Sequence, residues 1–131
     1  MFLSLLLSAW IVGPGADPAP SQPVRVLFLG DNGHHQPALR YRQLASAWSK
    51  EYTEDAKVLN PETLAKYDAL MVYANHAKIE PEQEKALLDF VQSGKGFVPV
   101  HCASYCFLNS PEYIRLVGAQ FQRHGTGTFT T

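Results

Sequence analysis

Short apolar runs that alternate with helical segments constrain the fold of this sequence more than any other feature. The clearest run is VRVLFL at residues 24–29, which stops at Gly30 as a strand buried in a parallel sheet does. Since parallel strands are joined by right-handed crossovers, usually helices, repeated strand–helix units predict helices on both faces of the sheet. The expected fold class is therefore α/β, a doubly wound parallel sheet in three layers.

The remaining elements follow the same alternation. Further strands are expected at residues 56–59, 69–73 and 97–100, and helices at residues 37–48 and 61–66, from Pro81 and from Pro111. Pro99 is an awkward residue for a central strand, because proline has no N–H group to donate to the ladder. Residues 120–131 are expected to form a strand or an extended loop. With only four or five strands in all, the sheet is expected to be incomplete at the C-terminus.

The N-terminus has a different composition from the rest of the chain. Residues 1–12 contain only two polar side chains, and so short an apolar run matches the core of a signal peptide, not a stable membrane span. We therefore expect a signal peptide at residues 1–16, a proline-rich linker at 17–23 and the α/β domain at 24–131, in a periplasmic or secreted protein. The first basic residue is Arg25, so either the true start lies upstream or the signal is atypical. The alternative is an apolar strand or helix that packs on the domain.

Composition excludes several classes of function. Hydrophobic residues make up 46% of the chain and charged residues 18%, which is typical of a folded globular protein. Eleven basic and twelve acidic residues nearly balance, and the absence of a basic run argues against a nucleic-acid partner. No GxGxxG or Walker pattern indicates a nucleotide, and no cofactor can be named.

The histidines gather where a ligand site is expected. In an open α/β sheet, ligands bind beyond the carboxyl ends of the strands. Four of the five histidines follow predicted strands, and the fifth lies in the C-terminal segment: His34, His35, His76, His101 and His124. Together with neighbouring polar residues they predict a ligand-binding edge that comprises Asp31, Asn32, His34, His35, Asn75, Ser104 and His124. The alternative is that histidine is simply a residue that loops tolerate.

Cys102 is the candidate nucleophile. It follows the fourth predicted strand at a strand-to-helix turn, where the dipole of a following helix lowers the pKa of a thiol. A cysteine nucleophile needs a histidine within hydrogen-bond reach, and His76 is a better partner than the adjacent His101, which an extended chain directs to the other side. The catalytic candidates are therefore Cys102, His101 and His76. The competing interpretation is inert packing, with Cys106 buried or bridged to Cys102.

A metal site is a further alternative. Histidines at three strand ends, together with Asp31, could supply nitrogen and oxygen ligands to zinc. Neither an HxH nor an HExxH spacing supports such a site, and no metal ligand is assigned.

Several of these segments together resemble the ThuA-like (trehalose utilisation) family of the class I glutamine amidotransferase-like superfamily. They are residues 26–31 with the following Gly33-His34-His35, then residues 67–73, 94–101 and 117–125. The resemblance implies a flavodoxin-like fold and a link to sugar catabolism. It places Cys102 where amidotransferases carry their nucleophile and where ThuA-like proteins often carry serine. Members generally lack the amidotransferase His–Glu pair, so glutaminase activity is not implied.

The resemblance also sets the functional hypotheses. The first is an exported ThuA-like domain that binds or processes a sugar-derived small molecule, with enzymatic activity left open. The alternatives are a non-catalytic binding or interaction module and a truncated, inactive fragment, since the chain stops near the middle of the usual domain. The substrate and the oligomeric state are not indicated.

Overall fold

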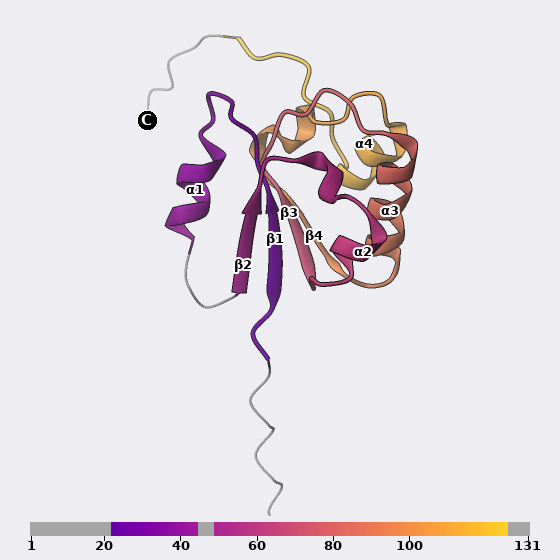
Figure 1. The fold of residues 1–131 in the computed structure, drawn as a ribbon. Helices are drawn as coiled ribbons and strands as arrows, with labels where there is room; N and C mark the ends of the chain where they lie inside the picture. Colours follow the sequence, from indigo (N-terminus) through magenta and orange to yellow (C-terminus); the bar gives the residue numbers. More distant parts are fainter. Residues whose placement is uncertain (1–21, 45–48, 126–131) are drawn as a thin grey trace, which may run out of the picture.

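Four parallel strands form one sheet in the computed structural model, which describes residues 22–44 and 49–125. The strands lie in the order β2-β1-β3-β4 (Figure 1), and their bounds are β1 Arg25–Leu29, β2 Ser49–Thr53, β3 Ala69–Val72 and β4 Gly96–Pro99. All three strand pairings are parallel. The prediction of an α/β fold with a parallel sheet is confirmed, whereas the predicted signal peptide and most of the linker lie outside the described residues.

Helices cover both faces of the sheet, as predicted. In Figure 1, α1 lies on one side of the sheet, and α2, α3 and α4 lie on the other. Their bounds are α1 Pro37–Gln43, α2 Pro61–Leu64, α3 Pro81–Gln92 and α4 Pro111–Val117, and two short 3₁₀ helices are η1 Ala56–Val58 and η2 His101–Tyr105. Each α-helix begins with proline, whose missing N–H would have no partner in the first turn. The predicted helix starts are therefore confirmed.

The second strand is where the sequence-based prediction was wrong. Residues 56–58 form η1, which starts because the Asp55 side chain accepts a hydrogen bond from the backbone N–H of Lys57. The strand lies earlier, at residues 49–53, and pairs with β1 at one edge of the sheet. Its sequence, SKEYT, is largely polar because an edge strand needs little apolar surface, so it carries no buried-strand pattern.

The position of β4 explains Pro99. β4 is the other edge strand of the described sheet. The backbone N–H of Gly96 donates to the carbonyl of Asp68, just before β3, at 2.9 Å, and that of Val100 donates to Val72 of β3 at 2.8 Å. By alternation the nitrogen of Pro99 therefore faces away from β3. A proline is tolerated there because no donor to β3 is required at that position.

The two faces of the sheet differ in how well they are covered. Between the sheet and α2, α3 and α4, Leu27 and Leu70 from the strands and Leu87 from α3 are at most 1% exposed. Each such leucine contributes about 1.5–3 kcal/mol of hydrophobic stabilisation. The face that α1 covers has a smaller core, and Val98 on β4 remains 40% exposed. Most of the hydrophobic stabilisation therefore comes from the larger face.

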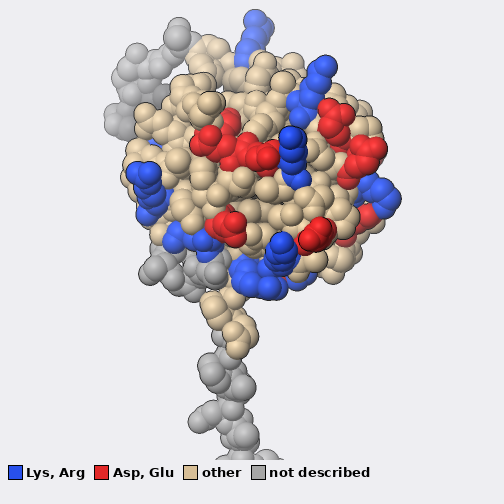
Figure 2. Space-filling model, in the orientation of Figure 1, with Lys and Arg blue, Asp and Glu red and all other residues tan. Residues whose placement is uncertain are grey.

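After α4 the chain changes direction at Gly118, which adopts a left-handed conformation (φ 80°). Residues 119–125 carry no strand, and the remainder of the predicted strand or loop lies outside the described residues. In the described part of the chain, no helix is long and apolar enough to cross a membrane. Figure 2 shows acidic and basic side chains interspersed on the viewed face, in keeping with the near-balanced composition.

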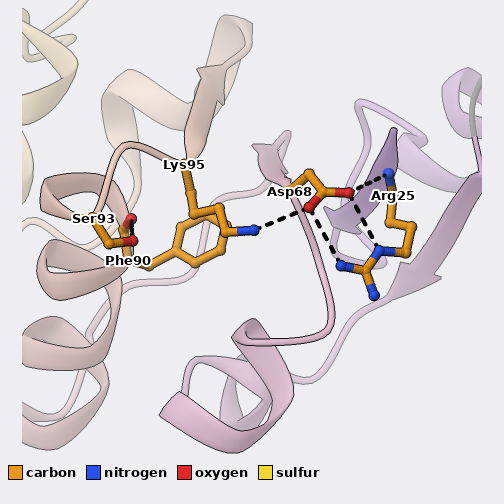
Figure 3. A network of polar contacts seen from close by, with 5 residues as sticks. All are labelled: Arg25, Asp68, Phe90, Ser93 and Lys95. Atoms are coloured by element: carbon orange, nitrogen blue, oxygen red, sulfur yellow. Dashed lines mark hydrogen bonds and ion pairs between the residues drawn. The ribbon is translucent and has the colours of Figure 1, made fainter. Parts of the chain in front are cut away.

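At the amino ends of the strands, Asp68 forms an ionic clamp with Arg25 and Lys95 (Figure 3). The Asp68 carboxylate accepts hydrogen bonds from the backbone N–H of Arg25 at 3.0 Å and from Lys95 Nζ at 3.0 Å. The Arg25 guanidinium donates to both carboxylate oxygens at 3.3 Å. These three residues begin or precede β1, β3 and β4, so one carboxylate ties three strand starts together.

The clamp predicts a pH-dependent contribution to stability. The hydrogen bonds from Arg25 and then from Lys95 hold the pKa of Asp68 well below its usual value of 3.8. Since the folded-state pKa is the lower one, the stabilisation is present above the unfolded-state pKa and is lost as the pH falls through the folded-state pKa. We expect Asp68→Asn to lower the urea midpoint of unfolding most at neutral pH. The difference in midpoint between the variant and the wild type should narrow below about pH 4.

The matched control is Asp89→Asn, which removes one exposed ion pair with Lys85 within α3. An isolated surface pair of this kind contributes little to stability. A gap between Asp68→Asn and wild type that stays constant from neutral to acidic pH would contradict the clamp.

Candidate functional site

The loops that follow β1, β3 and β4 meet at the carboxyl edge of the sheet, toward which all strand arrows point in Figure 1. Together with the segment after α4 they enclose a cavity of about 510 Å³. We call it the histidine cavity, and it is lined by His34, His35, Asn75, His101, Cys102, Ser104, Tyr105, Phe121 and His124. Five of the seven residues predicted to bind a ligand line this cavity, and the other two, Asp31 and Asn32, line a second cavity beside it. The histidines of the histidine cavity come from three separate segments.

Three imidazole rings form the centre of the site. The ring centroids of His34 and His35 are 3.9 Å apart, and those of His35 and His101 are 4.6 Å apart. The Tyr73 ring, at the end of β3, lies 5.8 Å from His101 and 6.2 Å from His35. His34 and His35 come from the loop after β1 and His101 from the turn after β4, so the fold joins residues that are far apart in the sequence.

The crowding of imidazoles affects the protonation of His35. Partial burial, then the nearby His34 and His101, lower its pKa from the usual 6.5, while Asp31 acts in the opposite direction. A positive charge on His34 or His101 disfavours a proton on His35, because like charges at this distance repel. At neutral pH His35 is therefore a neutral imidazole that can accept a proton.

Asp31 holds two of the converging loops together. Its carboxylate accepts hydrogen bonds from the backbone N–H of Gly33 at 2.7 Å and from that of Asn75 at 2.6 Å. The Tyr52 hydroxyl donates to the backbone carbonyl of Asp31 at 3.2 Å. Asp31, predicted as a ligand-binding residue, thus has both oxygens engaged with the backbone and fixes the loop that carries His34 and His35.

A second cavity of about 440 Å³ adjoins the first and shares Asn75 with it. It is lined by Asp31, Asn32, Gly33, Glu54, Asn75, His76 and Ala77. Within the described residues, the buried Oδ1 atom of the Asn75 side chain has no hydrogen-bond partner. An unpaired buried amide oxygen is costly, so Asn75 has capacity to bond a group that enters either cavity.

His76 does not join the imidazole cluster. Its Nε2 atom lies 3.0 Å from the carbonyl oxygen of Gly30, which only accepts hydrogen bonds, so Nε2 carries the proton. The ring stacks on Phe107 with centroids 5.9 Å apart. These contacts give His76 a structural role between the loops after β1 and β3, and the pairing of His76 with Cys102 that the sequence suggested is not among the described contacts.

The turn after β4 is strained at His101, not at Cys102. His101 adopts a left-handed conformation (φ 48°), which is uncommon outside glycine and marks sites that the surrounding structure holds in place. Its side chain is exposed, whereas that of Cys102 is 6% exposed and packs inward. Burial, then the nearby Asp31, raise the pKa of the Cys102 thiol to about 11, which contradicts the lowering expected from its position in the sequence.

Cys102 and Cys106 are both free, buried thiols. They are therefore packed side chains and do not form the disulfide bridge that was the alternative. Burial raises the pKa of Cys106 to about 12. The side-chain oxygen of Ser104 donates to the carbonyl of His101 at 3.1 Å, inside the turn. Cys106 thus packs beneath the turn, while His101, Ser104 and the small exposed part of Cys102 line the histidine cavity.

The segment after α4 closes one side of the histidine cavity. The backbone N–H of Phe121 donates to the carbonyl of Ser104 at 2.9 Å, and the Phe121 ring packs edge-on against Tyr105 at 5.9 Å. The ring centroids of His124 and Phe121 are 5.7 Å apart. His124 is thereby held among the residues that line the cavity.

Comparison with known proteins identifies the family. Residues 25–131 match the family model ThuA, described as trehalose utilisation. The chain belongs to the ThuA family. No curated protein matches it.

Two solved structures of ThuA-like proteins share the fold. One, from Bacteroides uniformis ATCC 8492, has a TM-score of 0.60 and 19% identity, with 81% of this chain and 48% of that chain covered. The other, from Parabacteroides merdae ATCC 43184, has a TM-score of 0.57 and 17% identity, with 70% and 37% covered. This ThuA chain thus spans less than half of either structure, and at such low identity the likeness concerns the fold alone.

Three aromatic residues of the site were missed by sequence reasoning in this ThuA chain. Tyr73 was assigned only to a strand, and Tyr105 and Phe121 were read as parts of a turn and an extended segment. Phe121 is 40% exposed and Tyr105 46%, and no signal in the sequence alone indicates that these two rings meet at the cavity. Among the described residues, no group of three or more potential metal-ligating side chains is arranged to hold an ion.

The state of the two thiols predicts their reactivity in the ThuA chain. With the pKa of Cys102 at about 11, about one molecule in ten thousand carries the thiolate at neutral pH. We expect neither Cys102 nor Cys106 to react appreciably with iodoacetamide in the folded protein at pH 7, and both to react after unfolding in urea. Mass spectrometry of tryptic peptides measures both reactions. Rapid and selective alkylation of Cys102 in the folded state would contradict this prediction and support Cys102 as a nucleophile.

Proposed function

We propose that this ThuA domain binds a sugar-derived small molecule in the histidine cavity. The observation that carries the proposal is the convergence of imidazole, amide, hydroxyl and aromatic groups from four segments on one cavity of about 510 Å³. Small-molecule sites are typically concavities of about 300–1,000 Å³ that combine apolar walls with a few placed polar groups. The position at the carboxyl edge of a parallel sheet is also where ligands bind in open α/β folds.

The chemistry of the lining supports a polyhydroxylated ligand. Imidazoles and the Asn75 amide can each donate or accept a hydrogen bond, which suits hydroxyl groups that also do both. The edge-on pair of Tyr105 and Phe121 supplies an apolar wall against which the C–H face of a sugar ring can pack. The family description, trehalose utilisation, points to the same class of compound.

Processing of the bound molecule would fall to the histidines. His35 is neutral at physiological pH and lies against His101, so the pair can accept and return a proton. Cys102 lines the cavity, but its raised pKa disfavours attack by a thiolate. The second candidate function, binding without catalysis, is favoured by this protonated and buried thiol. Recovery of the sugar unchanged after prolonged incubation would support it.

We also propose that the protein is exported to the periplasm or secreted. The apolar run at residues 1–12, followed by small residues up to Ala16, supports this proposal. We expect the mature protein, expressed from its full gene in a bacterial host, to begin at Asp17 and to be recovered outside the cytoplasm. N-terminal mass spectrometry of the fractionated cells measures this. Retention of residues 1–16 in a cytoplasmic product would contradict export.

The binding proposal predicts that Phe121→Ala weakens sugar binding without destabilising the fold. Loss of one aromatic wall should cost about 1 kcal/mol, or roughly a fivefold weaker Kd, for trehalose or glucose. Isothermal titration calorimetry measures the affinity, and thermal unfolding checks the fold. The matched control is Leu39→Ala on α1, because Leu39 is 42% exposed, close to the 40% of Phe121, and does not line the cavity. Absence of binding of either sugar to the wild-type chain would contradict the proposal.

A further inference from the structure

The ionisable groups that line the histidine cavity are mostly imidazoles. Four imidazoles contribute to it, yet no lysine, arginine, aspartate or glutamate is among the described residues that line it. Protonation of the imidazoles therefore changes the net charge of the cavity from about zero to positive, with no lining carboxylate to neutralise it.

We infer that the histidine cavity selects a sugar-derived anion, with a carboxylate or phosphate group held by the imidazoles, and that binding takes up a proton from solvent. This inference rests on the proposed function and names the class of ligand for the same cavity. Charge and protons balance, because the ligand brings a negative charge and one imidazole gains a proton to become an imidazolium. No covalent bond forms or breaks.

The ring geometry supports a shared anion site. His35 lies 3.9 Å from His34 and 4.6 Å from His101 between centroids, so one anionic group can contact rings from both the loop after β1 and the turn after β4. Without a ligand, the neighbouring rings of His34 and His101 oppose protonation of His35. An anion between the rings removes that opposition, because it attracts the positive charge that the neighbouring rings repel. Binding and protonation therefore favour each other.

The groups that face the cluster from other elements do not supply a competing anion. Tyr73, just after β3, approaches the cluster with a phenol ring and brings no carboxylate. Cys102, on the turn after β4, stays protonated because burial raises its pKa to about 11. His124, from the segment after α4, adds a fourth ring to the same lining.

Asp31 is the one carboxylate that acts on His35 from close by. It lines the neighbouring cavity, and its two oxygens accept the backbone N–H groups of Gly33 and Asn75. These two donors partly offset its charge, and no hydrogen bond between Asp31 and an imidazole is among the described contacts. Asp31 therefore eases protonation of His35 without occupying the place of the anion.

The test compares three ligands of matching size by isothermal titration calorimetry on the full chain. D-glucuronate carries a carboxylate, glucose 6-phosphate carries a phosphate, and glucose carries neither. Each is titrated near pH 6 and near pH 8, in two buffers with different heats of protonation, which together give the number of protons taken up. For one proton per anion, affinity should fall up to about tenfold per pH unit above the pKa of the free cluster.

We expect at least one of the two anions to bind more tightly than glucose near pH 6, with proton uptake that glucose does not show. The carboxylate and phosphate arms then identify the preferred group. His35→Gln, which keeps a polar side chain but cannot take a proton, should abolish the uptake and the pH dependence. The control is Lys78→Gln, which removes an exposed positive charge from the loop after β3 outside both cavities. It should leave the uptake unchanged.

The two ways of failing are distinguishable. If glucose binds as tightly as both anions and no proton is taken up, the anion inference is overturned and the proposed function stands. If none of the three ligands binds, the proposed function fails and the inference fails with it. Equal losses of anion binding in His35→Gln and Lys78→Gln would also overturn the inference, because they would indicate general surface electrostatics.

Discussion

The carboxylate of Asp31 connects the loop after β1 to the loop after β3, and the arrangement of the site depends on this connection. Its hydrogen bonds to the backbone N–H groups of Gly33 and Asn75 are charge-assisted, each with a net value of about 1.5–3 kcal/mol. Without them, the loop that carries His34 and His35 would lack its fixed position relative to Asn75. The short acidic side chain of Asp31, just after the central strand β1, thereby fixes the position of His34 and His35, to which it makes no described hydrogen bond.

The opposite end of the sheet is held in a comparable way. Asp68 ties the starts of β1, β3 and β4 together through Arg25 and Lys95, while Asp31 ties the loops that leave two of these strands. Because the strands are parallel, fixing their starts also fixes where they end. The large core under α2, α3 and α4 then keeps the sheet rigid beneath the cavity. The candidate site of this ThuA domain can therefore be formed by loops and still be well positioned.

Much of this architecture could be predicted from the sequence, and the exceptions have physical causes. The apolar runs of β1, β3 and β4 and the prolines that open each helix are local signals, so their elements were found. β2 was missed because an edge strand such as SKEYT has no buried pattern, and polar Asp55 started a 3₁₀ helix where a strand was expected. His34, His35 and His101 were placed on one edge by topology alone. The burial of Cys102, the structural contacts of His76 and the aromatic wall of Tyr105 and Phe121 depend on tertiary packing, which no local pattern encodes.

The central claim is that imidazoles from separate loops share one cavity and influence one another there. The most direct measurement is the pKa of His35 by ¹⁵N NMR titration, in the wild type and in His101→Gln. His101 is distant in sequence but lies 4.6 Å from His35 between ring centroids. The account predicts a pKa below 6.5 in the wild type that rises in His101→Gln and is unaffected by His76→Gln, whose ring lies outside the cluster. A pKa of His35 that does not change in His101→Gln would contradict the account.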